Sequence, residues 1–184
     1  MSLAATKKPS VILLYGAIAS GVMILFTLAT WWGGPEVFIG RAGYIKFILV
    51  IGTALAAGIA ARRRNDGLLG FRQALRVCFG VMVIGMAVQT LFAWGLLTAD
   101  GKFKRQLMPI IVAQSEATYR TFKYSDEEIA RSLAEVKATD PFSFGSMLRG
   151  LAWIYIILFL VSLGLAATVG QTKRNGSINR HTGI

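Results

Sequence analysis

The chain has 184 residues, enough for one domain, and 54% of them are hydrophobic. The mean hydropathy of +0.57 is too high for a soluble protein of this size. A net charge of +11 also suits nucleic-acid binding, but the basic residues cluster between and beyond long apolar windows. The composition therefore indicates a membrane protein and excludes nucleic acid as a partner.

Four apolar windows match the roughly twenty residues that a helix needs to cross a bilayer core of about 30 Å. The predicted fold class is all-α, a polytopic membrane protein in which residues 1–184 form a single domain. We expect four transmembrane helices at about 11–32, 42–61, 77–97 and 148–170, with a small helical extracytoplasmic cap in 98–144.

The first window, 11–32, carries no charge and follows Lys7 and Lys8. A signal peptide is the alternative, but its apolar region spans only 7–15 residues. This window is longer and ends in tryptophans and a Gly-Gly-Pro turn at 31–35, which is typical of an interfacial anchor. We therefore predict a retained span.

The second window, 42–61, begins beside Arg41 and includes Lys46. Long basic side chains at a span end reach the lipid headgroups, so both residues are interpreted as anchors, with Glu36 available to pair with one of them. An intramembrane ion site is the alternative.

Small residues recur at four-residue spacing in the first two spans, and they let helix backbones approach closely in lipid. We expect these spans to pack together, with a dimer face as the alternative. The residues are Gly16, Ala17, Ser20, Gly21, Gly52, Ala54, Ala56, Gly58 and Ala60.

Five arginines lie in the loop after the second span: Arg62, Arg63, Arg64, Arg72 and Arg76. The first three end the span, and residues 68–76 read as a short amphipathic helix in the membrane interface. We predict contact with anionic lipid headgroups at the cytoplasmic face, with specific binding of another anionic partner, such as a phosphate-bearing ligand, as the sharper alternative.

The third span, 77–97, holds a polar pair at its middle, Gln89 and Thr90. A buried amide in a membrane usually bonds across to a neighbouring helix, so an interhelical polar contact is predicted. A transport route is the alternative, although ionisable residues would normally mark one. Cys78 is the only cysteine, so no disulfide framework exists.

The outer segment 98–144 carries seven basic and seven acidic residues, so it is neutral. We expect one helix beginning near Met108, with Pro109 in its first turn, and a second of about twelve residues capped by Ser125 and Glu128. The two helices pack on each other or lie in the headgroup plane. The acids at 126–128 fit capping better than a cation site.

The distribution of charge predicts orientation, because cytoplasmic segments hold the excess of lysine and arginine. Both termini and the second loop are therefore expected on the cytoplasmic side of a bacterial inner membrane. Ten basic residues support this: Lys7, Lys8, Arg62, Arg63, Arg64, Arg72, Arg76, Lys173, Arg174 and Arg180.

Residues that commonly carry chemistry are sparse. The one histidine, His181, lies near the C-terminus, so a Ser-His-Asp set or a histidine-held cofactor within the spans is not expected. Gly67 and Gly70 lack the lysine that follows a phosphate-binding loop. We predict no metal, no cofactor and no enzyme activity.

Residues 62–80, RRRNDGLLGFRQALRVCFG, carry a basic run, then Gly, Phe-x-Gln-Ala-Leu, a base and Val. With SDEEIARSLAE at 125–135 and the following Pro141, this pattern resembles bacterial membrane proteins of the domain of unknown function family 4199. The resemblance covers most of the chain and implies four spans. It departs at Gly70, where the family tends to have serine, and it implies no activity or catalytic residue.

Three functions follow as hypotheses. The first is a non-catalytic accessory or scaffolding protein, part of a larger complex, whose partners are membrane lipids and other membrane-protein subunits. The second is a small oligomeric transporter or channel whose route is lined by Gln89, Thr90 and the acidic residues of the outer segment. The third is a membrane enzyme acting on lipid.

Overall fold

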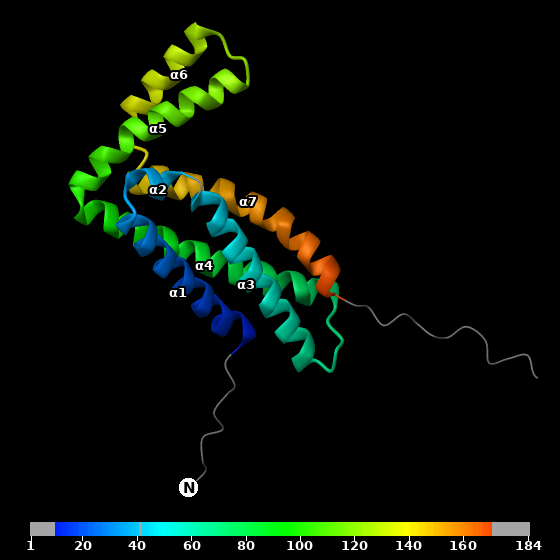
Figure 1. The fold of residues 1–184 in the computed structure, drawn as a ribbon. Coiled ribbons are helices and arrows are strands. Elements are labelled where there is room, and N and C mark those ends of the chain that lie inside the picture. The colour runs from blue at the N-terminus through cyan, green and yellow to red at the C-terminus, as the bar shows by residue number, and fades with distance from the viewer. Residues whose placement is uncertain (1–9, 41, 171–184) are drawn as a thin grey trace, which may run out of the picture.

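The computed structural model describes residues 10–40 and 42–170. Four of the helices in this part of the chain are long and apolar enough to cross a membrane, α1, α3, α4 and α7. Figure 1 shows these four side by side, with α5 and α6 extending beyond one end. The all-α, four-span class is thereby confirmed. The helices are α1 (Val11–Trp32), α2 (Pro35–Ile39), α3 (Ala42–Arg64), α4 (Phe71–Ala99), α5 (Gly101–Thr121), α6 (Asp126–Ala138) and α7 (Phe144–Val169).

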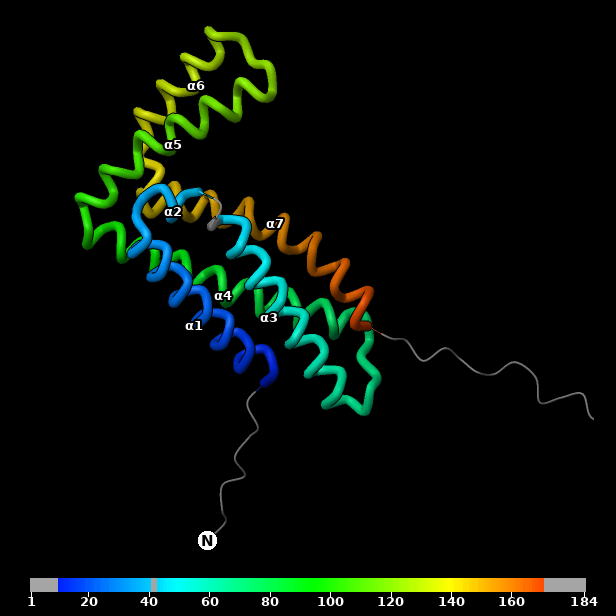
Figure 2. The backbone as a smooth tube through the Cα atoms, in the orientation of Figure 1, coloured from blue at the N-terminus to red at the C-terminus, as the bar shows by residue number. Residues whose placement is uncertain are grey.

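Two ends of the bundle are distinguished from here on. The arginine end is where α1 and α4 begin and where α3 and α7 finish, as the tube in Figure 2 shows. The opposite end carries α2 and the cap, a name used here for α5 and α6. The chain order thus alternates the direction of the four long helices.

Helix α4 occupies the centre of the bundle. It contacts α1, α3 and α7, whereas α1 and α7 do not touch each other among the described residues. In the most apolar 18-residue window of each helix, 44% of α4 is buried, against 28% of α1 and α3 and 22% of α7. The other three long helices therefore assemble around α4.

Glycines set the closest approaches to and around α4. A Cβ added at Gly16 would lie 3.0 Å from Ile84, and one added at Gly85 would lie 3.1 Å from the Cβ of Ala19. The S–H of Cys78 donates to the carbonyl of Ala54 in α3 over 3.6 Å. Small residues thus serve packing on α4 as well as the expected contact between the first two spans, which is present.

Part of the small-residue pattern faces outward instead. Gly21 and Gly52 have no atom near enough to touch an added Cβ, and Ala17 and Ala56 are exposed. Those positions do not contribute to packing within the chain, so a face toward a second chain stays a prediction for them.

Several serine and threonine hydroxyls inside the spans bond to their own helices, whereas the Tyr155 hydroxyl of α7 donates to the Val83 carbonyl of α4 at 3.1 Å. Ser20 donates to the carbonyl of Gly16 and Thr27 to that of Met23, each over 2.8 Å. Ser162 donates to the carbonyl of Phe159 over 2.7 Å. Such local bonds satisfy a polar group without a partner on another helix.

The expected interfacial helix at 68–76 is wrong as a separate element. Residues 68–70 are not helical, and α4 runs without a break from Phe71 through Arg76 into the span. Since no glycine or proline occurs from Phe71 to Phe79, nothing interrupts the helical hydrogen bonds there. The loop contributes one anchor, Leu69, which is fully buried.

The first helix of the cap, α5, begins earlier than predicted. Helix α5 begins at Gly101, with the Asp100 side chain capping the N–H of Phe103, so Pro109 lies inside the helix and not in its first turn. The short helix α2 was also not foreseen. The span boundaries were closer, since α1 matches its predicted limits and α3 and α7 extend theirs by a few residues.

Helix α6 confirms the predicted capping. Ser125 accepts from the backbone N–H of Glu128, and the Glu128 carboxylate accepts from the N–H of Ser125 at 3.0 Å. The N–H and the hydroxyl of Ser125 both donate to the Glu128 carboxylate, and these two bonds hold the pKa of Glu128 below its usual value. The helix ends before Asp140 and packs on α5, so the cap is a helical hairpin.

We expect Gly85→Leu to destabilise the bundle by about 1–3 kcal/mol, because the added side chain overpacks the contact with Ala19. Gly95→Leu on the same helix is the matched control, since an added Cβ there meets nothing within 4 Å. Thermal unfolding in mild detergent measures both. Equal midpoints for the two variants would contradict the tight α1–α4 contact.

Candidate functional site

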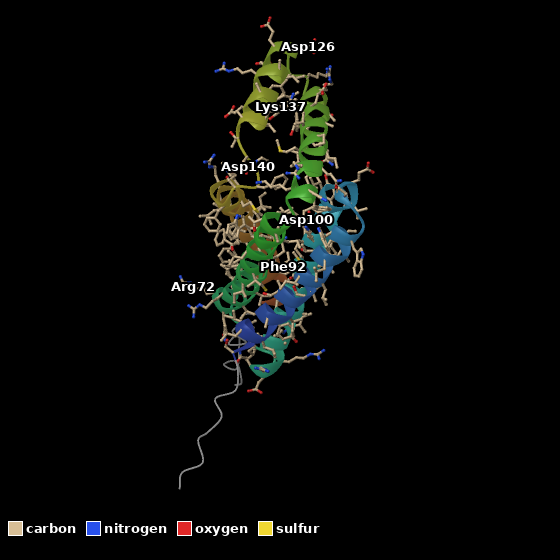
Figure 3. All side chains as sticks on the ribbon, turned by 90° about the vertical axis from the view of Figure 1, so that its left-hand side faces the viewer. Arg72, Phe92, Asp100, Asp126, Lys137 and Asp140 are labelled. Atoms are coloured by element: carbon tan, nitrogen blue, oxygen red, sulfur yellow. The ribbon has the colours of Figure 1, made fainter. Side chains whose placement is uncertain are left out.

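The structure separates the five loop arginines into two groups. Arg62, Arg63 and Arg64 form the last turn of α3, whereas Arg72 and Arg76 lie in the first turns of α4. Figure 3 shows Arg72 pointing away from the bundle. The five therefore do not converge on a single site.

A tight turn joins the two groups. The N–H of Gly67 donates to the carbonyl of Arg62 at 3.0 Å, and the Arg62 Nε donates back to the Gly67 carbonyl at 3.0 Å. Gly67 adopts φ +80°, which glycine tolerates without strain. The Arg62 side chain is thereby held against the loop.

The polar pair of the third span is split by the helix. Gln89 is buried and Thr90 lines an apolar depression of about 150 Å³ between α4 and α7, near Trp94 and Phe144. Neither side chain forms a hydrogen bond with another described residue. The interhelical contact predicted for them stays a prediction.

A second hydrophobic cluster fastens the cap to the bundle, and we call it the outer cluster. Phe103 is at its centre, edge-on to Phe38 with ring centroids 5.4 Å apart and to Trp31 at 6.2 Å. Five helices or linkers meet here, since its members are Trp31, Phe38, Ile39, Leu97, Phe103, Leu107, Met108, Ile111 and Phe142.

Two polar groups border the outer cluster. The Nζ of Lys46 lies 4.9 Å from the centroid of the Phe38 ring, a cation–π contact that places this lysine at the span end, as an interfacial anchor requires. The Trp31 Nε1–H is buried without a hydrogen-bond partner among the described residues. Arg41, the other predicted anchor, lies outside the described residues. The Glu36 side chain forms no ion pair with any described residue.

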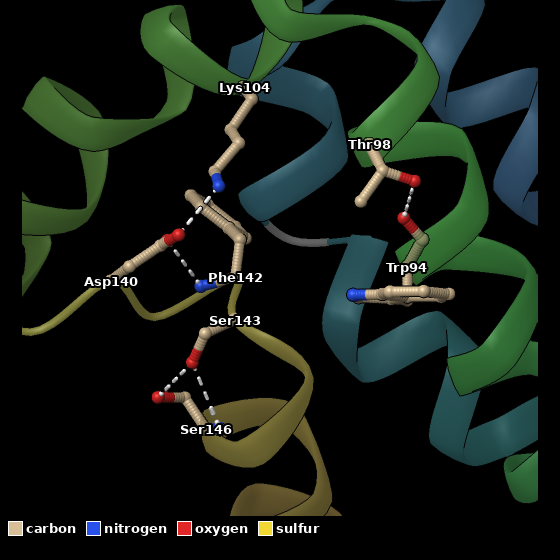
Figure 4. A network of polar contacts seen from close by, with 7 residues as sticks. All are labelled: Trp94, Thr98, Lys104, Asp140, Phe142, Ser143 and Ser146. Carbon is tan, nitrogen blue, oxygen red and sulfur yellow. Dashed lines mark hydrogen bonds and ion pairs between the residues drawn. The ribbon is translucent and has the colours of Figure 1, made fainter.

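An ion pair closes the cap from the other side. Lys104 donates to Asp140 Oδ2 at 2.6 Å, and the N–H of Phe142 donates to Asp140 Oδ1 at 3.0 Å, as Figure 4 shows. The bond from Lys104 is the main reason that the pKa of Asp140 lies below its usual value, with the Phe142 bond adding to it. Helix α5 and the α6–α7 linker are thus tied together.

An open cleft of about 510 Å³ lies between the cap and α7, and we call it the cap cleft. Tyr119 of α5, Glu135 of α6, and Arg149 and Trp153 of α7 contribute to its walls. It offers one positive group, one negative group and two aromatic rings, which can bind a surface of mixed chemistry.

Two of the three acidic residues that begin α6 are already engaged. Glu128 caps α6, and Asp126 lies 3.6 Å from the Nη1 of Arg120. Within residues 10–40 and 42–170 no group of three histidine, cysteine or acidic side chains is placed to hold a metal ion. His181 lies outside that part of the chain.

A family model for proteins of unknown function (DUF4199) matches residues 14–169, from the first turn of α1 to the end of α7. The chain belongs to this family. Comparison with curated proteins and with solved structures gave no match. The resemblance noted in the loop and in α6 is confirmed, and membership in DUF4199 brings no catalytic residues with it.

Sequence reasoning missed two features on which the cap of this DUF4199 protein depends, the helix start at Gly101 and the Lys104–Asp140 pair. Phe103, Leu107 and Ile111 recur at four-residue spacing, and Asp100 stands three residues before Phe103. This spacing and this capping residue together signal a helix from 101. Lys104 and Asp140 are 36 residues apart, so no local pattern could pair them.

We expect Phe103→Ala to release the cap while leaving the four long helices folded, because truncating a buried phenylalanine costs about 3–5 kcal/mol. Phe122→Ala is the control, since Phe122 is 72% exposed at the tip of the cap. Limited proteolysis within 101–138 measures the release. Equal cleavage of the two variants would show that the outer cluster does not hold the cap.

The Lys104–Asp140 contact predicts a pH dependence. A lowered pKa means that the contact stabilises the fold above the ordinary aspartate value of about 3.9 and is lost as the pH falls through the lower, folded value. The amide-proton NMR shift of Phe142 reports this titration. We expect a midpoint below 3.9 that rises in Lys104→Gln and is unchanged in Lys102→Gln. A midpoint insensitive to Lys104→Gln would contradict the pairing.

Proposed function

We propose that this protein is a non-catalytic accessory subunit of a bacterial inner-membrane complex, which binds the extracytoplasmic part of a partner membrane protein in the cap cleft. The cap cleft is the observation that carries the proposal. Tyrosine, tryptophan and arginine are the residues most enriched at the energetic centres of protein interfaces. Tyr119, Arg149 and Trp153 bring these residue types together, and Trp153 is 67% exposed.

The attachment of the cap supports a docking role. A surface held in its bound conformation loses less conformational entropy when a partner arrives. The outer cluster and the Lys104–Asp140 pair fasten α5 and the α6–α7 linker to the bundle, which fixes one wall of the cap cleft relative to α7.

The interior of the bundle supports a non-catalytic role. The hydroxyls of Ser20, Thr27 and Ser162 bond to carbonyls of their own helices, so they serve helix structure. The excess of arginine at the arginine end supports its cytoplasmic location, which in turn puts the cap on the outer side.

The test is purification from the native host in mild detergent, followed by native mass analysis. We expect a heteromeric complex that is lost in the Arg149→Ala/Trp153→Ala double variant, because truncating two central interface residues typically costs more than 2 kcal/mol.

The control is Trp32→Ala, which removes a tryptophan that is 88% exposed near the same end but outside the cap cleft. This variant should retain the complex. A homo-oligomer alone, with ion flux after reconstitution in liposomes, would overturn the proposal in favour of a small transporter or channel.

A further inference from the structure

A groove of about 470 Å³ opens at the arginine end, between α3 and the end of α7. We call it the arginine groove. It lies at the opposite end of the bundle from the cap cleft. Its lining residues come from α3, from the α3–α4 turn and from the last residues of α7: Leu55, Ile59, Arg62, Arg63, Gly67, Thr168 and Val169.

The α3 wall of the groove changes from apolar to basic along the helix. Leu55, Ile59 and Arg62 are spaced by four and three residues, so they lie on one helical face in that order toward the arginine end. Ile59 is 42% exposed, which leaves this face accessible from the surrounding membrane. The groove therefore has an apolar part at the depth of acyl chains and a basic part at the depth of headgroups.

Close packing holds the α7 wall of the groove against α3. An added Cβ at Gly58 would lie 3.2 Å from Val169 Cγ1 and 3.1 Å from Cys78 Sγ. Helices α3, α4 and α7 thus meet closely behind the groove. The groove is therefore open at the surface and closed at its base by these helices.

The arginines are positioned for an anion. The bond from Arg62 Nε to the Gly67 carbonyl orients the guanidinium group and leaves its two terminal nitrogens without a bond to any described residue. Neither Arg62 nor Arg63 forms an ion pair with a carboxylate in residues 10–40 or 42–170. Arg62 and Arg63 both line the groove, and a guanidinium group matches the geometry and charge of a phosphate.

We propose that the arginine groove binds one anionic phospholipid, with its phosphate on Arg62 and Arg63 and one acyl chain along Leu55 and Ile59. Charge complementarity favours an anionic headgroup. The apolar side chains of Leu55 and Ile59 favour a lipid over a soluble phosphate compound. Each basic side chain near an anionic headgroup strengthens binding about fivefold, so the pair contributes about thirtyfold.

The experiment compares two double variants that remove the same charge from the same end. Arg62→Gln/Arg63→Gln neutralises the groove, and Arg72→Gln/Arg76→Gln neutralises the two exposed arginines of α4. Native mass spectrometry of the detergent-purified chain counts bound palmitoyl-oleoyl phosphatidylglycerol during titration, with phosphatidylcholine of the same chains as reference.

We expect one phosphatidylglycerol bound at least about thirtyfold more tightly than phosphatidylcholine. This preference should fall about thirtyfold in Arg62→Gln/Arg63→Gln and less than threefold in Arg72→Gln/Arg76→Gln. Equal losses in the two double variants would reduce the effect to general surface charge and overturn the proposal.

Two further measurements test the role of the apolar part of the groove. Ile59→Trp fills the groove without changing charge, and since Ile59 is partly exposed the larger side chain is tolerated. It should weaken phosphatidylglycerol binding at least tenfold. Glycerol 3-phosphate should not compete. Effective competition, or undiminished binding in Ile59→Trp, would show a simple anion site and contradict a lipid groove.

Discussion

Close packing on α4 is the constraint on which the rest of the structure depends. In lipid, apolar side chains gain nothing by leaving their surroundings, so helices associate through tight contacts and local polar bonds. Gly16 against Ile84 and Gly85 against Ala19 supply such contacts between α1 and α4. Because α1 and α7 do not contact each other among the described residues, each is positioned in the bundle through its contacts with α3 and α4.

The outer cluster is organised by a different force. At the end of the spans water is available again, so burying Phe103, Leu107 and Phe142 contributes hydrophobic stabilisation that lipid does not provide. Residues from α1, α2, α4, α5 and the α6–α7 linker contribute to this one cluster. The orientation of the cap is therefore linked to the ends of the spans. The Trp31 Nε1–H is the one side-chain polar group that this packing leaves buried and without a hydrogen bond among the described residues.

The sequence was sufficient where the signal is local. The apolar window 11–32 coincides with α1, and the Ser125–Glu128 capping box begins α6 as expected. It was insufficient where a boundary depends on tertiary contacts. Pro109 suggested a helix start because proline suits a first turn, yet Asp100 capping and the anchoring of Phe103 outweigh the hydrogen bond that proline cannot form.

The two candidate sites show the same limit. Arg62 and Arg63 were recognisable as basic residues, but the groove that they border exists only because α7 returns beside α3. The cap cleft likewise needs Arg149 and Trp153 of α7 to face Tyr119 and Glu135 of the cap. Helix α7 is the least buried of the long helices, so part of its surface is left uncovered by the other helices. Helix α7 therefore forms a wall of both openings. Because the other walls come from distant parts of the chain, no continuous stretch of sequence predicts either opening.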